Sequence, residues 1–398
     1  MSFRDIHKRW EFDLKSSPER LWPFIADTNR FNRDTGVPEV EIDKAQKQLR
    51  NARRKLRLSV YGLPIEWEEQ PFEWVRPKRF GIERVYSKGP MARLRVLAQL
   101  TPNADGGTHL VYEVWSTPRN LPGAFAISLQ LGLIVARRFR DAILKYDAAA
   151  SNGGSNEMTE HDTSRSSFDM ARLASLREKL LADLEQADMP REKCAIAERL
   201  VEFIEHADDL AATRIRPYKL ADDWNERRRD VLEVFLHATR AGLLDFQWDL
   251  LCPMCRGPQE SGKSLRDIQT DVHCDGCKID FRVNFDRYVE LTFRPNPAVR
   301  RVEVRSFCVG SPELTPHVVA QQLLQAGEQR VLDLPLESGT YRLRALELQG
   351  AQDLVVSADG ATSAQINLST NDWTSDTLRV AERSSFDLRN QTDAEQLL

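Results

Sequence analysis

The sequence predicts a multidomain α+β protein, because the spacing of its apolar residues changes along the 398 residues. Apolar and polar side chains alternate over much of residues 5–115, as they do in half-buried strands. Residues 167–243 carry apolar side chains at helical spacing, and from Tyr288 the period returns to two. The length suits two to four domains, and 41% hydrophobic with 29% charged residues is ordinary for globular protein.

The first predicted domain spans residues 1–148 and begins with a strand over 5–16. Ser17 and Pro18 then suit the N-cap and the first position of a helix. Turn-forming residues separate the strand patterns that follow, which indicates an antiparallel meander. These patterns cover Lys55–Tyr61, Glu66–Trp74, Phe80–Tyr86, Ala92–Gln99 and His109–Trp115. A long helix from about Leu121 to Asp147 closes the domain. Residues 121–136 are uncharged but too short for a membrane span, so we expect this stretch to be buried against the sheet.

The order strand, short helices, strands and long C-terminal helix resembles the START-like, or helix-grip, superfamily. The strings that carry the resemblance are SSPERLWPFIADTNRFN, RRKLRLSVYG, GGTHLVYEVW and ARRFRDAILKY. The resemblance implies a sheet wrapped around the long helix, with an apolar cavity for lipids, polyketides or other hydrophobic molecules. Six residues are candidates to line that cavity, although they would equally suit a filled core: Trp67, Trp74, Tyr112, Trp115, Phe125 and Leu129.

Residues 149–166 are small, polar and rich in Gly and Ser, which predicts a flexible linker that uncouples the first domain from the rest. Residues 167–250 then form a helical module. Its end resembles a winged helix, with helices over Tyr218–Trp224 and Arg227–Arg240, a C-cap at Gly242 and a strand over Asp245–Leu251. A DNA reader would direct the arginines of the second helix to phosphates, but acidic residues crowd the same stretch, so nucleic acid is the less favoured partner.

Two Cys-x-x-Cys pairs lie within residues 251–287 and predict a zinc-ribbon segment. Each two-residue gap lets both thiolates of a pair reach one centre, and two such pairs complete a tetrahedral site that suits Zn²⁺. Because four protein ligands leave no open position, we expect a structural zinc. The predicted ligands are Cys252, Cys255, Cys274 and Cys277. The remaining cysteines, Cys194 and Cys308, stand alone, as expected in a reducing cytoplasm.

Residues 288–398 predict an all-β sandwich, since short alternating segments follow one another with Pro, Gly and Asn between them. The predicted strands are Tyr288–Phe293, Val302–Val309, Arg330–Leu334, Gly339–Leu348, Asp353–Ser357, Ser363–Leu368, Thr377–Glu382 and Phe386–Asn390. No polar taper follows Leu397 and Leu398, so we expect the native chain to continue beyond them.

Charge is distributed unevenly between the two parts of the chain. Residues 1–150 hold 26 Lys and Arg against 18 Asp and Glu, a net charge of +8, whereas the whole chain is at −4. A positive surface favours anionic ligands, nucleic acid or a membrane, but solvated strand faces explain it more simply. The N-terminus has no apolar signal-peptide core, which favours a cytoplasmic location, and no transmembrane segment is expected.

From about residue 213 onward the sequence resembles the regulatory region that precedes the catalytic domain of bacterial class III adenylate and guanylate cyclases. The strings are RIRPYKLADDW, EVFLHATRAGLLDFQWDLLCPMCR, VHCDGCKIDF, VELTFRPNPAVR and TPHVVAQQLL. The resemblance implies a sensory or regulatory region joined to a C-terminal cyclase domain. No cyclase metal motif, P-loop, Rossmann fingerprint or nucleophile elbow occurs, so this chain alone is not expected to be catalytic.

Two alternatives remain open on the sequence, while the ligand and the oligomeric state are not specified by it. One is a zinc-containing winged-helix regulator that binds DNA. The other is a START-like enzyme of the polyketide cyclase type, which needs an acid or base inside its cavity. The candidates for that role are Glu66, His109, Tyr112 and Glu113.

Overall fold

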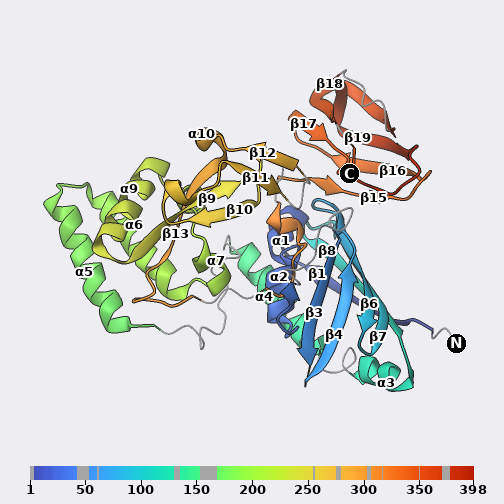
Figure 1. Cartoon of the computed structure of the whole chain (residues 1–398), viewed down its shortest axis with the longest axis horizontal. Coiled ribbons are helices and arrows are strands. Elements are labelled where there is room, and N and C mark those ends of the chain that lie inside the picture. The colour runs from blue at the N-terminus through green and yellow to red at the C-terminus, as the bar shows by residue number, and fades with distance from the viewer. Residues whose placement is uncertain are drawn as a thin grey trace.

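The computed structural model describes most of the chain. The described residues are 4–42, 53–60, 62–129, 135–152, 168–253, 256–274, 279–302, 306–315, 317–348, 350–369 and 377–398. They form a mixed α+β structure with a large antiparallel sheet near the N-terminus, a helical unit with its own sheet, and a C-terminal β unit (Figure 1).

The N-terminal unit has the element order that the sequence predicted. Strand β1 (Ile6–Leu14) leads into the short helices α1 (Pro18–Ile25) and α2 (Thr28–Asp34). The strands that follow are β2 (Glu41–Ile42), β3 (Arg54–Val60), β4 (Leu63–Glu69), β5 (Glu73–Val75), β6 (Arg79–Lys88), β7 (Met91–Pro102) and β8 (Thr108–Pro118). The sheet order is β1-β8-β7-β6-β4-β3-β2, with β5 beside β6, so it is the expected meander with β1 returned to the β8 edge.

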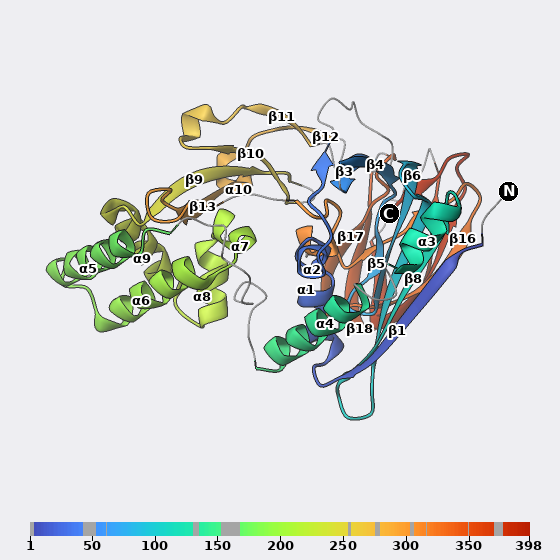
Figure 2. The same cartoon turned by 90° about the horizontal axis from the view of Figure 1, so that it is seen from below.

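Helices α3 (Leu121–Leu129) and α4 (Val135–Ser151) occupy the stretch for which one long helix was predicted, and the residues between them lie outside the described part. Figure 2 shows α1, α2 and α4 gathered on one face of the N-terminal sheet. Helix α4 buries Phe139, Ile143 and Tyr146, which are spaced by three and four residues and so share one helix face. This face and the inner side chains of β1, β6, β7 and β8 form one core.

The expected burial of α3 is wrong at its exposed positions. Leu121 and Phe125 are 75% and 73% exposed, although the helix carries no charge. No helix among the described residues is long and apolar enough to cross a membrane.

The helical unit contains α5 (Met170–Gln186), α6 (Arg191–His206), α7 (Asp209–Thr213), α8 (Pro217–Trp224) and α9 (Arg228–Ala241). Gly242 ends α9 with a φ of 96°, as its predicted capping role requires. Strand β9 (Leu244–Leu251) follows and lies between β10 (Pro258–Gly262) and β13 (Val289–Pro295) in an antiparallel sheet. The hairpin of β11 (Asp271–Cys274) and β12 (Ile279–Arg282), with the short helix α10 (Phe285–Tyr288), completes this part.

The C-terminal β unit begins later than the predicted boundary at residue 288. Phe293 of β13 is fully buried in the core of the helical unit, because β13 pairs with β9. The predicted strand Val302–Val309 is wrong where its residues are described, since residues 306–309 have no strand assignment. Strand β14 (Ala320–Gln321) pairs with β5 and so extends the N-terminal sheet.

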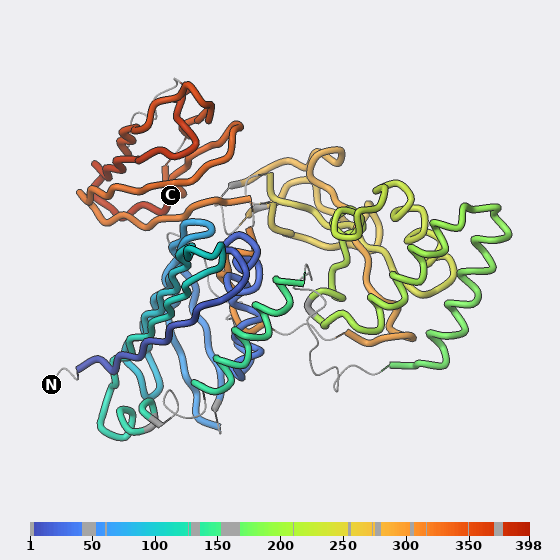
Figure 3. The backbone as a smooth tube through the Cα atoms, turned by 180° about the vertical axis from the view of Figure 1, so that it is seen from behind, coloured from blue at the N-terminus to red at the C-terminus, as the bar shows by residue number. Residues whose placement is uncertain are grey.

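In the part of the chain that the structure describes, the remaining strands form two separate sheets. The sequence predicted one all-β sandwich over residues 288–398, which would have included β13. Strand β15 (Leu323–Leu324) pairs with β20 (Gln396–Leu397). The four-stranded sheet has the order β16-β19-β18-β17, formed by β16 (Gln329–Pro335), β19 (Leu378–Asn390), β18 (Gln352–Leu368) and β17 (Gly339–Leu343). Two pairs of predicted strands merge, because β18 and β19 each continue through the turn expected between them. Figure 3 shows the C-terminal β unit beyond one end of the N-terminal sheet.

The predicted uncoupling of the N-terminal unit is also wrong, since other segments attach it to the rest of the chain. Arg30 of α2 forms an ion pair with Asp208, the N-cap of α7, and both side chains are almost completely buried. Residues 306–311, which we call the return segment, lie against α1 and α2 (Figure 1). Residues 149–151 of the predicted linker belong to α4, and residues 153–166 lie outside the described part of the chain. The ion pair and the return segment attach the first unit to the rest.

Candidate functional site

The inner face of the N-terminal sheet places apolar and aromatic side chains opposite α4. Tyr112 and Phe139 have ring centroids 4.7 Å apart, and Phe139 also contacts Trp10 at 5.1 Å and Phe31 at 5.3 Å. These rings fill the region between β8 and α4. We call this packed interior, bounded by the inner face of the sheet, α2 and α4, the inner chamber.

Three of the six predicted lining residues are buried in or beside the inner chamber. Tyr112 belongs to the main core. Trp67 of β4 packs with Tyr86 at the β3–β4 side of the sheet, with ring centroids 5.8 Å apart. Trp74 is in the main core too, and its indole N–H donates to the Val318 carbonyl at 3.0 Å.

The other predicted lining residues are not brought together with these. Trp115 lies three residues from Tyr112 on the same strand, and side chains alternate along a strand, so it occupies the opposite face. There it stacks on His7 at 4.9 Å and lies beneath Arg95 at 4.4 Å. Phe125 faces solvent. The side chain of Leu129 lies outside the described residues.

An ion pair that the sequence analysis missed lies on the inner face. The Arg84 Nε atom donates to Glu69 Oε2 at 3.0 Å, and the Glu69 side chain is only 3% exposed. The Arg84 guanidinium lies 5.5 Å from the Trp67 ring centroid. Burial lowers the pKa of Arg84, but Glu69, with smaller contributions from Tyr86 and Cys308, more than offsets this, so the net pKa is raised and the guanidinium stays charged.

Neighbouring polar groups give the chamber a distinct polar end around Arg84. The Trp67 Nε1 atom is buried and has no hydrogen-bond partner among the described residues, and the same is true of Ser116 Oγ, on the inner face of β8. Burial raises the pKa of the Tyr86 and Tyr112 hydroxyls, so both remain protonated donors at neutral pH. A buried donor without a partner is unfavourable and is stabilised by any acceptor that reaches it.

A signal for this polar end was present in the sequence. Phe80, Ile82, Arg84 and Tyr86 alternate along β6 and therefore share its inner face. A single arginine in such an apolar series marks a buried charge, which must be paired.

The return segment supplies further residues to the same region. Val309 packs with Trp67 and Tyr86, and Cys308 belongs to the main core. The Thr28 hydroxyl donates to Cys308 Sγ at 3.1 Å, and burial raises the pKa of this thiol. Side chains from the downstream half of the chain thus form part of the chamber boundary.

The candidates for an acid or base of a polyketide cyclase-type enzyme are mostly elsewhere. His109 bonds to Asp13 at 2.7 Å and Glu113 to His7 at 3.0 Å, both on the outer face. Glu66 pairs with Lys88 at 2.8 Å in an exposed position. Only Tyr112 of that set faces the chamber.

The predicted metal ligands fall into two groups. Cys252 and Cys274 are 0% and 1% exposed and belong to one small cluster with Phe281 and Leu346. Cys255 and Cys277 lie outside the described residues. Arg256, with φ 55°, donates its N–H to the Cys252 carbonyl at 3.0 Å. Two thiol-bearing segments from distant strands thus meet, but a tetrahedral zinc site needs further ligands, and no group of three or more potential ligands comes together among the described residues.

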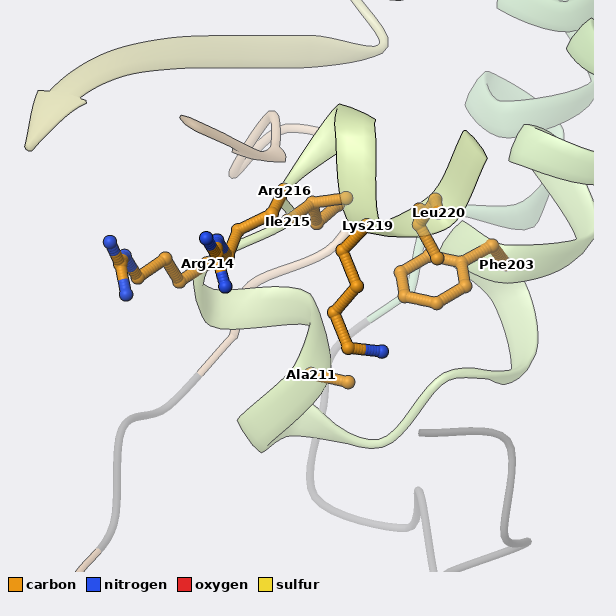
Figure 4. A pocket seen from close by; sticks show the side chains of 7 residues that line it. All are labelled: Phe203, Ala211, Arg214, Ile215, Arg216, Lys219 and Leu220. Carbon is orange, nitrogen blue, oxygen red and sulfur yellow. The ribbon is translucent and has the colours of Figure 1, made fainter. Parts of the chain in front are cut away.

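Three of the arginines proposed for DNA contact, Arg227, Arg228 and Arg229, already have acidic partners. Arg228 donates to Asp222 at 2.7 and 2.9 Å, and Arg229 donates to Glu233 at 2.9 Å. A recess between α6, α7 and α8 also has positive side chains, and Figure 4 shows Lys219 directed from α8 toward Ala211. Arg216 at this recess bonds to Glu290 and Lys219 to Asp223, so neither place presents an uncompensated basic surface.

Comparisons with known proteins give one family match. Residues 175–366 match a family of unknown function (DUF5939). A search of curated proteins found no match.

Solved structures similar to part of this chain include the Zhui aromatase/cyclase from Streptomyces sp. R1128, at 14% identity and a TM-score of 0.29, covering 38% of this chain and 99% of that one. The di-domain ARO/CYC StfQ from the steffimycin biosynthetic pathway is 5% identical with a TM-score of 0.29, over 37% of this chain and 52% of its own. The Mll3558 protein from Rhizobium loti is 22% identical with a TM-score of 0.26, over 36% and 98%. At these values the similarity does not indicate what the present chain binds.

Proposed function

We propose that this chain is a sensory region of a nucleotide cyclase-type signalling protein, in which the N-terminal START-like unit binds a hydrophobic small molecule. The observation that carries the proposal is that Val309, from the segment matched to DUF5939, packs on Trp67 and Tyr86 of the inner chamber. A ligand that moves those aromatic side chains therefore acts directly on the downstream chain. The catalytic output of such a protein belongs to a separate cyclase domain, C-terminal to this sensory region.

The chemistry of the chamber indicates the class of ligand. Aromatic and aliphatic side chains supply most of its surface, which favours an apolar body. Arg84 and the Trp67 indole N–H, which has no partner among the described residues, supply donors at one end. The ligand we infer is largely apolar and carries one oxygen-bearing acceptor, such as a carbonyl or an acidic group.

We also propose that one structural Zn²⁺ binds Cys252, Cys255, Cys274 and Cys277. Bound zinc would hold the turn after β9 against the β11–β12 hairpin. Leu346 of the C-terminal unit packs on the same cluster, so the site stabilises a junction between two units. The metal supplies folding free energy and no catalytic chemistry in this position.

Two related dyes test the ligand proposal. N-phenyl-1-naphthylamine is neutral, and 1-anilinonaphthalene-8-sulfonate adds an anionic group to nearly the same rings. We expect the wild-type chain to bind both. The double variant R84M/E69Q replaces the ion pair by neutral side chains of similar size. A lost charge-assisted hydrogen bond of about 1.5–3 kcal/mol should weaken sulfonate binding roughly 10- to 100-fold and leave the neutral dye little changed.

Arg93→Met is the matched control, because Arg93 pairs with Glu83 at an exposed position of the neighbouring strand β7. It should change neither affinity. Failure of wild-type protein to bind either dye would contradict a hydrophobic ligand chamber, and equal loss in both arginine variants would contradict the role of Arg84.

A further inference from the structure

The return segment is held on the N-terminal unit by a set of hydrogen bonds to its backbone. Asn29 Oδ1 accepts from the N–H groups of Phe307 at 2.6 Å and Cys308 at 2.9 Å. Asn32 donates to the Phe307 carbonyl at 2.9 Å, and Arg54 donates to the Val309 carbonyl at 2.7 Å. Each of these bonds joins a side chain of the N-terminal unit to the backbone of the return segment.

We propose that the return segment is a displaceable wall of the ligand chamber, and that its displacement reports ligand occupancy to the downstream units. The inference rests on the proposed function and adds two binding-site residues, Cys308 and Val309, together with a route of regulation. The ligand class is the one inferred above, an apolar molecule with one oxygen-bearing group.

Some part of the boundary of the inner chamber must move for a ligand to enter, because the aromatic rings inside it are already in contact with one another. The sheet walls are joined by continuous ladders, such as the nine-residue pairing of β1 with β8. The return segment has no such ladder over residues 306–309, all of which the structure describes, so its release breaks fewer and more isolated bonds.

Close contact on one side also sets the direction of movement. A Cβ atom added at Gly310 would lie 2.7 Å from Phe72 Cδ2, so the backbone of the segment passes close to the Phe72 ring at this point. A ligand that displaces the core side chains, of which Phe72 is one, therefore pushes the segment outward.

Displacement would reach two units of the chain, because of where the return segment lies in the sequence. On its N-terminal side, Arg300 is fully buried in the helical unit and bonds to the Ile204 carbonyl at 2.7 Å. On its C-terminal side, β14 pairs with β5 and β15 begins the C-terminal unit. A shift of residues 306–311 thus acts on the connection between the helical unit and the C-terminal unit.

Cys308 provides a direct measurement, since it is 4% exposed and reacts only when the segment opens. The experiment is N-ethylmaleimide labelling of the full chain, with the rate at Cys308 followed by peptide mass spectrometry. Asn29→Ala removes the acceptor of two segment N–H groups and should raise the rate about 10-fold or more. Arg54→Met removes the bond to Val309 from an exposed position and should raise it by a smaller factor.

Asn103→Ala is the matched control, because Asn103 Oδ1 likewise accepts two backbone N–H groups, in a loop away from the segment. It should leave the Cys308 rate unchanged. Unchanged rates in both Asn29→Ala and Arg54→Met would overturn the proposal.

The second arm adds 1-anilinonaphthalene-8-sulfonate to wild-type protein at saturating concentration. Faster labelling of Cys308 is the expected result. Dye binding with an unchanged or slower rate would overturn the displaceable wall and leave the proposed function intact. Absence of binding by both naphthyl dyes would overturn the two together.

Discussion

Replacing Asp208 by Asn should weaken the attachment of the N-terminal unit to the helical unit. The Asp208 and Arg30 side chains are 1% and 4% exposed, and Asp208 also lies 3.6 Å from Arg33. Asparagine keeps the hydrogen bond to the Ala211 N–H and the capping preference, so the main change is the lost charge. Arg30 keeps a second carboxylate, since its Nε atom lies 3.3 Å from Asp27 Oδ2, so the loss should be smaller than the about 3–5 kcal/mol of a buried charge with no partner.

The measurement is hydrogen exchange of the full chain, since separate units make a single unfolding free energy poorly defined. Amides of α2 and α7 should exchange roughly 10-fold faster or more in D208N. Asp169→Asn is the control, because Asp169 caps α5 through the Arg172 N–H at 2.9 Å from an exposed position. The double variant D208N/R30M should recover part of the loss, since it removes the stranded charge. If D208N affects α7 no more than D169N affects α5, the buried pair does not join the units.

Three other variants test separate features of the structure. Cys274→Ser should remove bound zinc and raise amide hydrogen exchange in β9 and β11, whereas Cys194→Ser should leave the zinc content unchanged. Metal analysis that finds no zinc in freshly purified, reduced wild-type protein would contradict the zinc site. Hydrogen bonds from Lys193 and Arg229 lower the pKa of Glu233 to about 2. Wild type should therefore exceed Glu233→Gln in urea stability above about pH 4.5, with the difference lost as the pH falls toward 2. The difference should be no more than about 1 kcal/mol, because one of the two partners, Arg229, is 81% exposed. Burial raises the pKa of Glu313, so its ionised form destabilises the fold. Glu313→Gln should therefore be more stable than wild type at neutral pH, and the difference in stability should vanish in acid. A difference in stability that stays constant across pH would refute burial as the cause.

Local patterns in the sequence predicted the elements of the N-terminal unit well. Period-two alternation identified β6 and β8, and the helical spacing of α9 with Gly242 at its end identified that helix and its cap. These signals are local, since side-chain direction and capping depend on neighbours a few residues away.

Contacts between distant segments could not be predicted in the same way. Nothing near Asp208 in sequence indicates that its partner is Arg30, and residues 306–309 read as a strand because apolar alternation also suits a segment packed on another unit. Solvated strand faces explain most of the positive charge of residues 1–150, and that explanation does not distinguish the buried Arg84 from the exposed arginines. Trp115 was included among the lining residues because it is large and apolar, although strand parity places it opposite Tyr112.

The central claim is that the N-terminal chamber holds an apolar ligand, and native mass spectrometry of the full chain purified from cells tests it most directly. The account predicts a bound mass beyond protein and zinc that organic extraction removes and that a medium-length fatty acid or N-phenyl-1-naphthylamine restores at one molecule per chain. Wild-type protein that carries no such mass, and accepts neither compound after extraction, would contradict it.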